Sequence, residues 1–248
     1  MNWLAVTSLT SALVAIGALA VTALSFNTTQ QGQYTDRYTK AIDELDKVGT
    51  EHLQARLGGI YSLERLAHDS ARDQSTIIEV LSAFIRTATP TAVDPLDGTP
   101  RTCPDRTVAP DVQAALTVLG RRDTTQDNDT RVDLRQTCIR HAELTNAHLS
   151  EANLNHADLA GAYLENADLA YANLTFAHFD NASIPHADLT YALLNYAYLT
   201  SANLDAAKLT HTNFDSAHLE GTDLRDTDHD GAVVVNATAN AETRGKWW

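Results

Sequence analysis

Cysteine, methionine and proline are scarce in this 248-residue sequence, which contains two, one and six of them. Two cysteines cannot form the multi-disulfide framework of a small secreted domain. Basic residues are also few, since 18 Lys and Arg against 32 Asp and Glu give a net charge of −14. Binding to nucleic-acid phosphates needs clustered Lys and Arg, so we expect no nucleic-acid partner.

Catalytic motifs are missing as well. The sequence has no G-x-S-x-G, no phosphate-binding loop ending in Gly-Lys-Ser/Thr, no HExxH and no paired Cys-x-x-Cys. Residues 226–231 (DTDHDG) match the opening of an EF-hand calcium loop, but its twelfth position is Ala237 instead of the required Glu. We therefore expect a protein that is not an enzyme, with no cofactor, no resident metal and no small-molecule substrate.

Charged side chains are absent from residues 1–35. The apolar residues 4–26 are enough to cross a hydrocarbon core of ~30 Å as a helix. The alternatives are a signal peptide cleaved near Ala18-Leu19-Ala20 and a buried soluble helix. Because Met1-Asn2-Trp3 lacks the basic residues of a signal peptide, we expect an uncleaved transmembrane anchor over residues 1–27.

The residues after this segment predict its orientation. Arg37, Lys40 and Lys47 follow the apolar run, and the positive-inside rule then places the bulk of the chain in the cytoplasm. The few cysteines agree with a reducing compartment, so we expect Cys103 and Cys138 to be free thiols, with a bridge between them as the alternative. The sequence thus predicts a single-pass membrane protein.

Helical periodicity continues over residues 34–88. Apolar residues recur at steps of three and four in residues 51–69, and a second stripe follows in residues 77–85. We expect a small helical hairpin whose two stripes bury each other. Binding of a partner helix by this face is the alternative.

Five of the six prolines lie between Pro90 and Pro110. Proline interrupts helices, so residues 89–131 are predicted to be an extended linker, with a short capping helix over residues 111–119 that Gly120 ends.

A five-residue repeat extends from Val132 to Asp226 without an insertion. Nineteen consecutive units have a large apolar residue at the centre, which is Leu in fifteen of them, and a small residue two positions earlier, which is Ala in fifteen. Neither a helix nor a straight strand can bury a residue at every fifth position on one side. The backbone must therefore turn in every unit and form a coil whose rungs stack at ~4.8 Å.

Units such as 152–154 (ANL), 157–159 (ADL) and 167–169 (ADL) resemble the pentapeptide-repeat family. This resemblance implies a right-handed, four-sided β-helix with four units per coil. Residues 56–66 and 112–122 are also similar to segments of bacterial membrane-anchored pentapeptide-repeat proteins. The expected fold is therefore mainly a β solenoid over residues 132–226. A transmembrane helix and a small α-helical segment precede it, and residues 227–248 form a C-terminal cap and tail.

Aromatic residues are predicted to gather on the coil. If each coil has twenty residues, Tyr171 stacks on Tyr191 and Phe176 on Tyr196, with Tyr198 nearby. Exposed aromatics grouped in this way are typical of a binding surface, although a stacked ladder that only steadies neighbouring rungs is the alternative.

The predicted function follows from these features. Residues 132–226 contain thirteen acidic and four basic side chains, a net charge of −9. We expect a membrane-anchored, non-catalytic scaffold that presents an acidic and partly aromatic surface to an unidentified protein partner. Because some members of the resembled family are acidic rods that imitate DNA and occupy type II topoisomerases, an acidic DNA-mimic inhibitor is the alternative.

Overall fold

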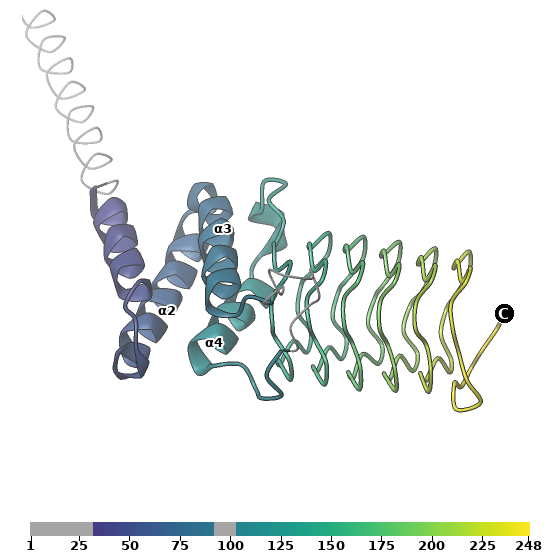
Figure 1. Ribbon diagram of the computed structural model, residues 1–248. Helices are drawn as coiled ribbons and strands as arrows, with labels where there is room; N and C mark the ends of the chain where they lie inside the picture. Colours follow the sequence, from purple (N-terminus) through teal and green to yellow (C-terminus); the bar gives the residue numbers. More distant parts are fainter. Residues whose placement is uncertain (1–31, 92–102) are drawn as a thin grey trace, which may run out of the picture.

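Helices and a rod of stacked coils make up the part of the chain that the computed structural model describes, residues 32–91 and 103–248. The helices gather at one end, and the coils follow one another toward the C-terminus at the other end (Figure 1). The predicted transmembrane helix, residues 4–26, lies outside the described residues.

The predicted membrane location is contradicted. No helix within residues 32–91 and 103–248 is long and apolar enough to cross a bilayer. The argument from cysteine also fails, because Cys103 and Cys138 form a disulfide instead of two free thiols. Disulfides persist mainly in oxidising compartments, so these two residues do not support a cytoplasmic location.

The helical end contains residues 32–45, which are helical, and five short or medium elements. These are η1 (Thr50–His52), α2 (Leu53–Asp69), α3 (Ala71–Ala88), α4 (Pro110–Gly120) and η2 (Thr124–Gln126). Extended backbone at Ser70 separates α2 from α3. The two predicted apolar stripes meet in the core, where Ile60 and Leu63 of α2 and Ile77 and Leu81 of α3 are buried.

Helix α4 connects the helices to the rod. Pro110 occupies its first turn, where the missing N–H costs nothing. Its next residue, Asp111, is buried and pairs with Arg56 of α2. Apolar residues of α4 such as Leu116 and Leu119 are buried in one core that is continuous with the first coil.

The rod is a four-sided coil with twenty residues per turn. Parallel bridges join residues twenty apart in four columns, which begin with Asp133–Asn153, Cys138–Asp158, Glu143–Tyr163 and His148–Asp168. This confirms the expected four units per coil. We name the sides face 1 (132–134), face 2 (137–139), face 3 (142–144) and face 4 (147–149), each together with the residues at multiples of twenty further along the chain.

A tight turn forms every corner of the coil. At one of them the N–H of Ala152 donates to the carbonyl of Leu149 at 3.1 Å, and the residue before Ala152, Glu151, has a φ of +59°. Positive φ at the third turn residue is the pattern of a type II turn. This turn is the change of direction that the five-residue spacing required.

The interior of the coil is filled with the repeat's central apolar residues and its alanines, nearly all fully buried. Thr212 and Thr222 replace the small alanine in two late units, and each donates its hydroxyl to a backbone carbonyl, of Leu189 and Leu199. A buried hydroxyl is tolerated when it is hydrogen-bonded.

The first coil has no earlier coil beneath it, and the helical end takes that place. In later coils each bridge residue uses both its N–H and its carbonyl, as Asn153 does with Val132 and Leu134. In the first coil, where no earlier coil is available, backbone N–H and carbonyl groups of the bridge residues bond to residues that precede the coil in the sequence. Asp133 bonds Ser82 and Arg86, Cys138 donates to the carbonyl of Thr89, Glu143 bonds both ends of the Gln113 amide, and His148 bonds the carbonyl of Gly120 and the guanidinium of Arg122. An unpaired strand edge is thereby covered on all four faces.

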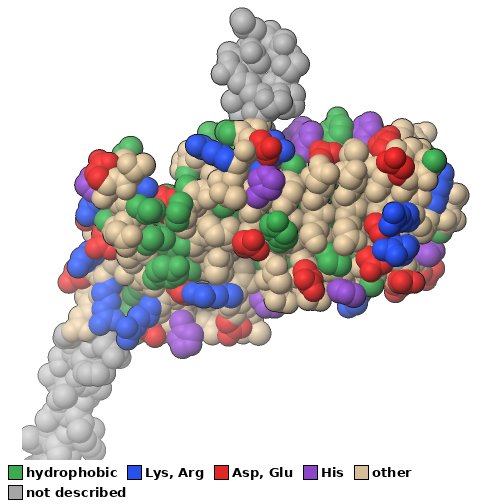
Figure 2. Space-filling view, turned by 90° about the horizontal axis from the view of Figure 1, so that it is seen from below, with side chains coloured by type: hydrophobic (Ala, Val, Ile, Leu, Met, Phe, Trp, Pro, Cys, Tyr) green, Lys and Arg blue, Asp and Glu red, His purple; other side chains and the backbone are tan. Residues whose placement is uncertain are grey.

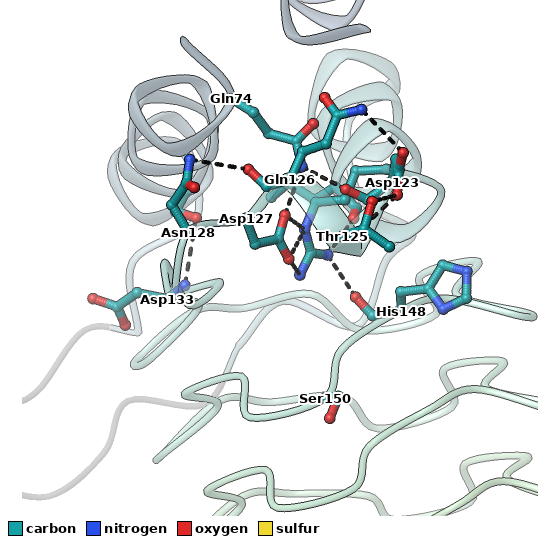
Figure 3. Close-up of polar contacts among 12 residues, drawn as sticks. Gln74, Asp123, Thr125, Gln126, Asp127, Asn128, Asp133, His148 and Ser150 are labelled. Carbon is teal, nitrogen blue, oxygen red and sulfur yellow. Dashed lines mark hydrogen bonds and ion pairs between the residues drawn. The ribbon is translucent and has the colours of Figure 1, made fainter. Parts of the chain in front are cut away.

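Arg122 is central to a polar network at this junction. Figure 3 shows Asp127 and His148 of this network, together with Gln74 and Asp123. The guanidinium of Arg122 bonds the carboxylate of Asp127 and donates to the carbonyl of His148 at 2.6 Å. Gln74 of α3 donates to the same carboxylate and to the carbonyl of Asp123. The network fixes α3, α4 and the η2 loop against the first coil.

At the other end the coils continue beyond residue 226, where the strict repeat ends. Bridges still join Lys208 to Asp228, Asn213 to Val233, His218 to Thr238, and Asp223 to Arg244. Trp247, near the end of the predicted C-terminal cap and tail, stacks on His229 with 4.3 Å between the ring centroids.

Candidate interaction surface

The aromatic residues singled out from the sequence lie on and around one face of the rod. Tyr171 and Tyr191 occupy the corner at one edge of face 1, and Phe176 and Tyr196 occupy the corner at its other edge. Tyr198 lies on the adjoining face 2, at a bridge position. The coil therefore brings all five residues to one region of the surface.

Their rings stack between coils as predicted. The ring centroids of Tyr171 and Tyr191 are 5.0 Å apart, and those of Phe176 and Tyr196 are 4.9 Å apart. The ring planes are within 10° of parallel in both pairs. Each ring thereby covers one face of its partner, and all four side chains remain at least one-third exposed.

Histidines, which were not predicted as part of the surface, extend the stacks. His156 lies against Phe176 at 4.7 Å, and His211 against Tyr191 at 4.7 Å. Burial lowers the pKa of His156, and the nearby His178 lowers it further. The neutral, apolar form of this ring is therefore favoured next to Phe176.

The sequence-based reasoning also missed Leu193. It is a bridge residue at the middle of face 1 and is 44% exposed, although leucines in this rod are otherwise central and buried. The positions twenty residues before and after it are Asn173 and Asn213. Aligning the sequence in rows of twenty would have shown a leucine in an outward-facing column of asparagines.

Four of these aromatics have a strained backbone. Tyr171, Phe176, Tyr191 and Tyr196 have φ between +57° and +60°. Among the described residues they are the only Tyr or Phe with positive φ, whereas many other corners have Asn or Gly. The left-handed conformation costs an ordinary L-residue roughly 1–2 kcal/mol, and Asn and Gly adopt it most easily. The bulkiest side chains are thus at costly positions, all bordering face 1.

Face 1 is uncharged over its two central coils. Its outward side chains there are Tyr171, Asn173, Thr175, Phe176, Tyr191, Leu193, Asn195 and Tyr196. In the same two coils, face 2 and the corner that follows it present Asp180, face 3 and its corner Asp205, and face 4 Asp188. Burial opposes ionisation of Asp180, but hydrogen bonds with His178 and Thr200 outweigh it and lower the pKa. Acidic side chains are spread along the rod in Figure 2, while hydrophobic ones gather at the helical end.

Metal-binding clusters are absent from residues 32–91 and 103–248. There is no group of three His, Cys, Asp or Glu side chains that could hold a metal ion there. The EF-hand-like residues 226–231 continue the coil, with Asp228 bridged to Lys208. Two surface clefts of about 320 and 280 Å³ lie on the helical end, lined by residues of the 32–45 helix, α2 and α3, away from the aromatic surface.

Comparison with known proteins identifies the repeat. A family model described as pentapeptide repeats matches residues 130–164, 147–184, 157–195 and 187–226. No curated protein matches the sequence.

Several solved structures are similar to this chain. A pentapeptide repeat protein from the cyanobacterium Cyanothece 51142 is 27% identical over 44% of this chain and 65% of its own, with a TM-score of 0.21. One from Nostoc PCC 7120 is 30% identical over 42% and 74%, with a TM-score of 0.17. QnrB1, a plasmid-mediated fluoroquinolone resistance protein, is 16% identical over 44% and 61%, with a TM-score of 0.24.

The chain spans less than two thirds of the Cyanothece and QnrB1 structures. Because these TM-scores are low, the family is assigned from the repeat sequence and the matching family model, and not from the solved structures. Pentapeptide-repeat proteins have a right-handed β-helix, in agreement with the four-sided coil described above. Through residues 130–226, this chain belongs to the pentapeptide-repeat family.

Proposed function

We propose that this protein is a non-catalytic scaffold that binds a protein partner through face 1 of its rod. One observation carries the proposal: Tyr171, Phe176, Tyr191 and Tyr196 occupy corners with positive φ, and all border the two central coils of face 1, which present no charged side chain. Positive φ is common to the corners of this coil, so these four residues are distinguished by the size and apolar character of their side chains. Their placement on a single face therefore supports a role in recognition.

The composition of face 1 agrees with this role. Tyrosine and phenylalanine are enriched at the centres of protein interfaces, where charged residues are depleted. The four corner aromatics and Leu193 are each at least one-third exposed, so they retain apolar area to bury on binding. The rest of the rod surface, with its acidic side chains, keeps the protein soluble around this patch.

A non-catalytic role is supported by the packing of the rod. Its interior is filled by the apolar centres and alanines of the repeat, which leaves little room for a buried acid–base site. The alternative, an acidic mimic of DNA, has weaker support. Face 1 lacks charge over its two central coils, and Lys208 and Arg225 pair with Asp188 and Asp223 on the other faces.

Crosslinking in the native cells tests the proposal. The full chain, a variant with Tyr171, Tyr191 and Tyr196 replaced by Ser, and a Tyr163→Ser control would be crosslinked and compared by mass spectrometry. Tyr163 is a matched control because it is 47% exposed but lies on face 3. We expect the triple variant to lose crosslinked species that the control retains. If the same crosslinked species survive in the triple variant while circular dichroism shows an intact fold, the proposal is wrong.

A further inference from the structure

We propose that the partner on face 1 is a second copy of this chain, and that face 1 is the two-fold symmetric interface of a homodimer. This inference rests on the proposed function, and it names the occupant of that surface.

Face 1 is chemically complementary to itself. In its two central coils the outward polar side chains are Tyr, Asn and Thr, and the remaining ones are Phe176 and Leu193. Tyrosine, asparagine and threonine each both donate and accept hydrogen bonds, whereas a carboxylate only accepts. A two-fold interface places the same patch on both sides, so it requires such a self-complementary set.

The distribution of charge also favours pairing of two copies through face 1. Each chain has a net charge of −14, so two copies repel at most orientations. Pairing through face 2 would bring Asp180 toward its own copy, and the environment of Asp180 lowers its pKa and keeps it ionised. Pairing through face 4 would bring the Asp188–Lys208 ion pair toward its own copy. Pairing through the centre of face 1 opposes no charged side chains. A strongly acidic chain can therefore approach itself most easily there.

The neutrality of face 1 also argues against a basic partner as its occupant. A surface that selects a basic protein would present acids around its aromatic centre, since charge complementarity supplies specificity. Within the two central coils the acidic side chains lie on the adjoining faces, and Asn173, Thr175 and Asn195 surround the rings. Glu151 and Asp215 lie one coil beyond this patch, one on each side. The interface is also small, because it is limited to one side of the coil. We therefore expect a reversible dimer with a Kd on the order of micromolar.

The geometry predicts which residues meet. A two-fold axis in the plane of face 1, perpendicular to the rod and passing between the two central coils, places Leu193 opposite Asn173 of the other copy and one coil away from that copy's Leu193. Leu193 and Tyr163 occupy equivalent bridge positions and are exposed to similar extents, 44% and 47%, but lie on opposite faces. Each is therefore the matched control for the other.

Crosslinking through an engineered cysteine is the direct test. Leu193→Cys and Tyr163→Cys would be introduced separately into the full chain and treated with a short bismaleimide, which does not react with the disulfide-bonded Cys103 and Cys138. We expect a covalent dimer from the first variant and little or none from the second. Equal crosslinking of both variants, or none of Leu193→Cys, would overturn the proposal.

Sedimentation equilibrium of the full chain gives a second, independent readout. Leu193→Asp places an acceptor-only charge against its own copy, and we expect it to weaken the dimer by tenfold or more, ~1.4 kcal/mol for each tenfold. Tyr163→Asp should leave the dimer unchanged. A chain that is monomeric throughout the micromolar range would refute the homodimer. If face 1 substitutions still remove crosslinks to a different protein, the proposed function survives that result; if they remove none, both proposals fail.

Discussion

Replacing Tyr196 with asparagine separates a binding role of the corner aromatics from a structural one. Tyr196 is 46% exposed, stacks on Phe176 alone and has a φ of +57°. Losing the half-buried ring lowers the folding stability by about 1 kcal/mol, and losing one aromatic pair lowers it by about 0.5–1.5 kcal/mol. Asparagine adopts positive φ more easily than tyrosine, and this offsets about 1 kcal/mol of the loss. The net cost of Tyr196→Asn is therefore about 1 kcal/mol.

A neighbouring core residue provides the scale for this change. Leu199 is fully buried at the centre of the next repeat unit, and Leu→Ala at such a site costs about 2–5 kcal/mol. Urea denaturation of the full chain, followed by far-UV circular dichroism, would compare Tyr196→Asn with Leu199→Ala through their midpoints and m-values. If Tyr196→Asn costs as much as Leu199→Ala, the aromatic stacks mainly hold the coils together. The argument that face 1 is maintained for binding would then be refuted.

Three further predictions concern the cap, the disulfide and one histidine. Arg122→Ala should destabilise the protein by about 3–5 kcal/mol in urea denaturation, because it removes the cation that pairs with the largely buried carboxylate of Asp127 and leaves that charge only the hydrogen bond from Gln74; a loss below about 1 kcal/mol would show that the junction network is dispensable. Reduction of the Cys103–Cys138 bridge, which spans 35 residues, should lower stability by about 3–4 kcal/mol, and a variant with both cysteines changed to Ser should not respond to reductant. Burial lowers the pKa of His156, so its contribution to stability is complete above the unfolded pKa of about 6.5 and is lost as the pH falls toward its lower folded pKa. As the pH falls from about 7.5 to about 5, the stability of His156→Phe should therefore rise relative to that of the natural chain. A difference in stability that stays constant over this range would contradict the lowered pKa of His156.

Some predictions from the sequence failed for identifiable reasons. The location was inferred from residues 4–26 and from the basic residues that follow, whereas the helices of the described part include none that could cross a membrane. Cys103 and Cys138 were expected to be free, but Cys103 lies against the first coil, where Arg140 donates to its carbonyl and its sulfur is bonded to that of Cys138. Pairing over 35 residues depends on the path of the chain, which local sequence patterns do not specify.

The period of five, with leucine at the centre and alanine two positions earlier, determined by itself that the chain turns at every unit and that these residues fill a narrow interior. Only the tertiary structure decided how many units close one coil. That number determines which residues share a column and a face, since side chains twenty positions apart meet only after the chain has gone around four corners. The helical cap was likewise decided in three dimensions: Gln113 and Arg122 are ordinary polar residues in the sequence, and they become strand-edge partners because folding places them against the open hydrogen-bonding groups of the first coil.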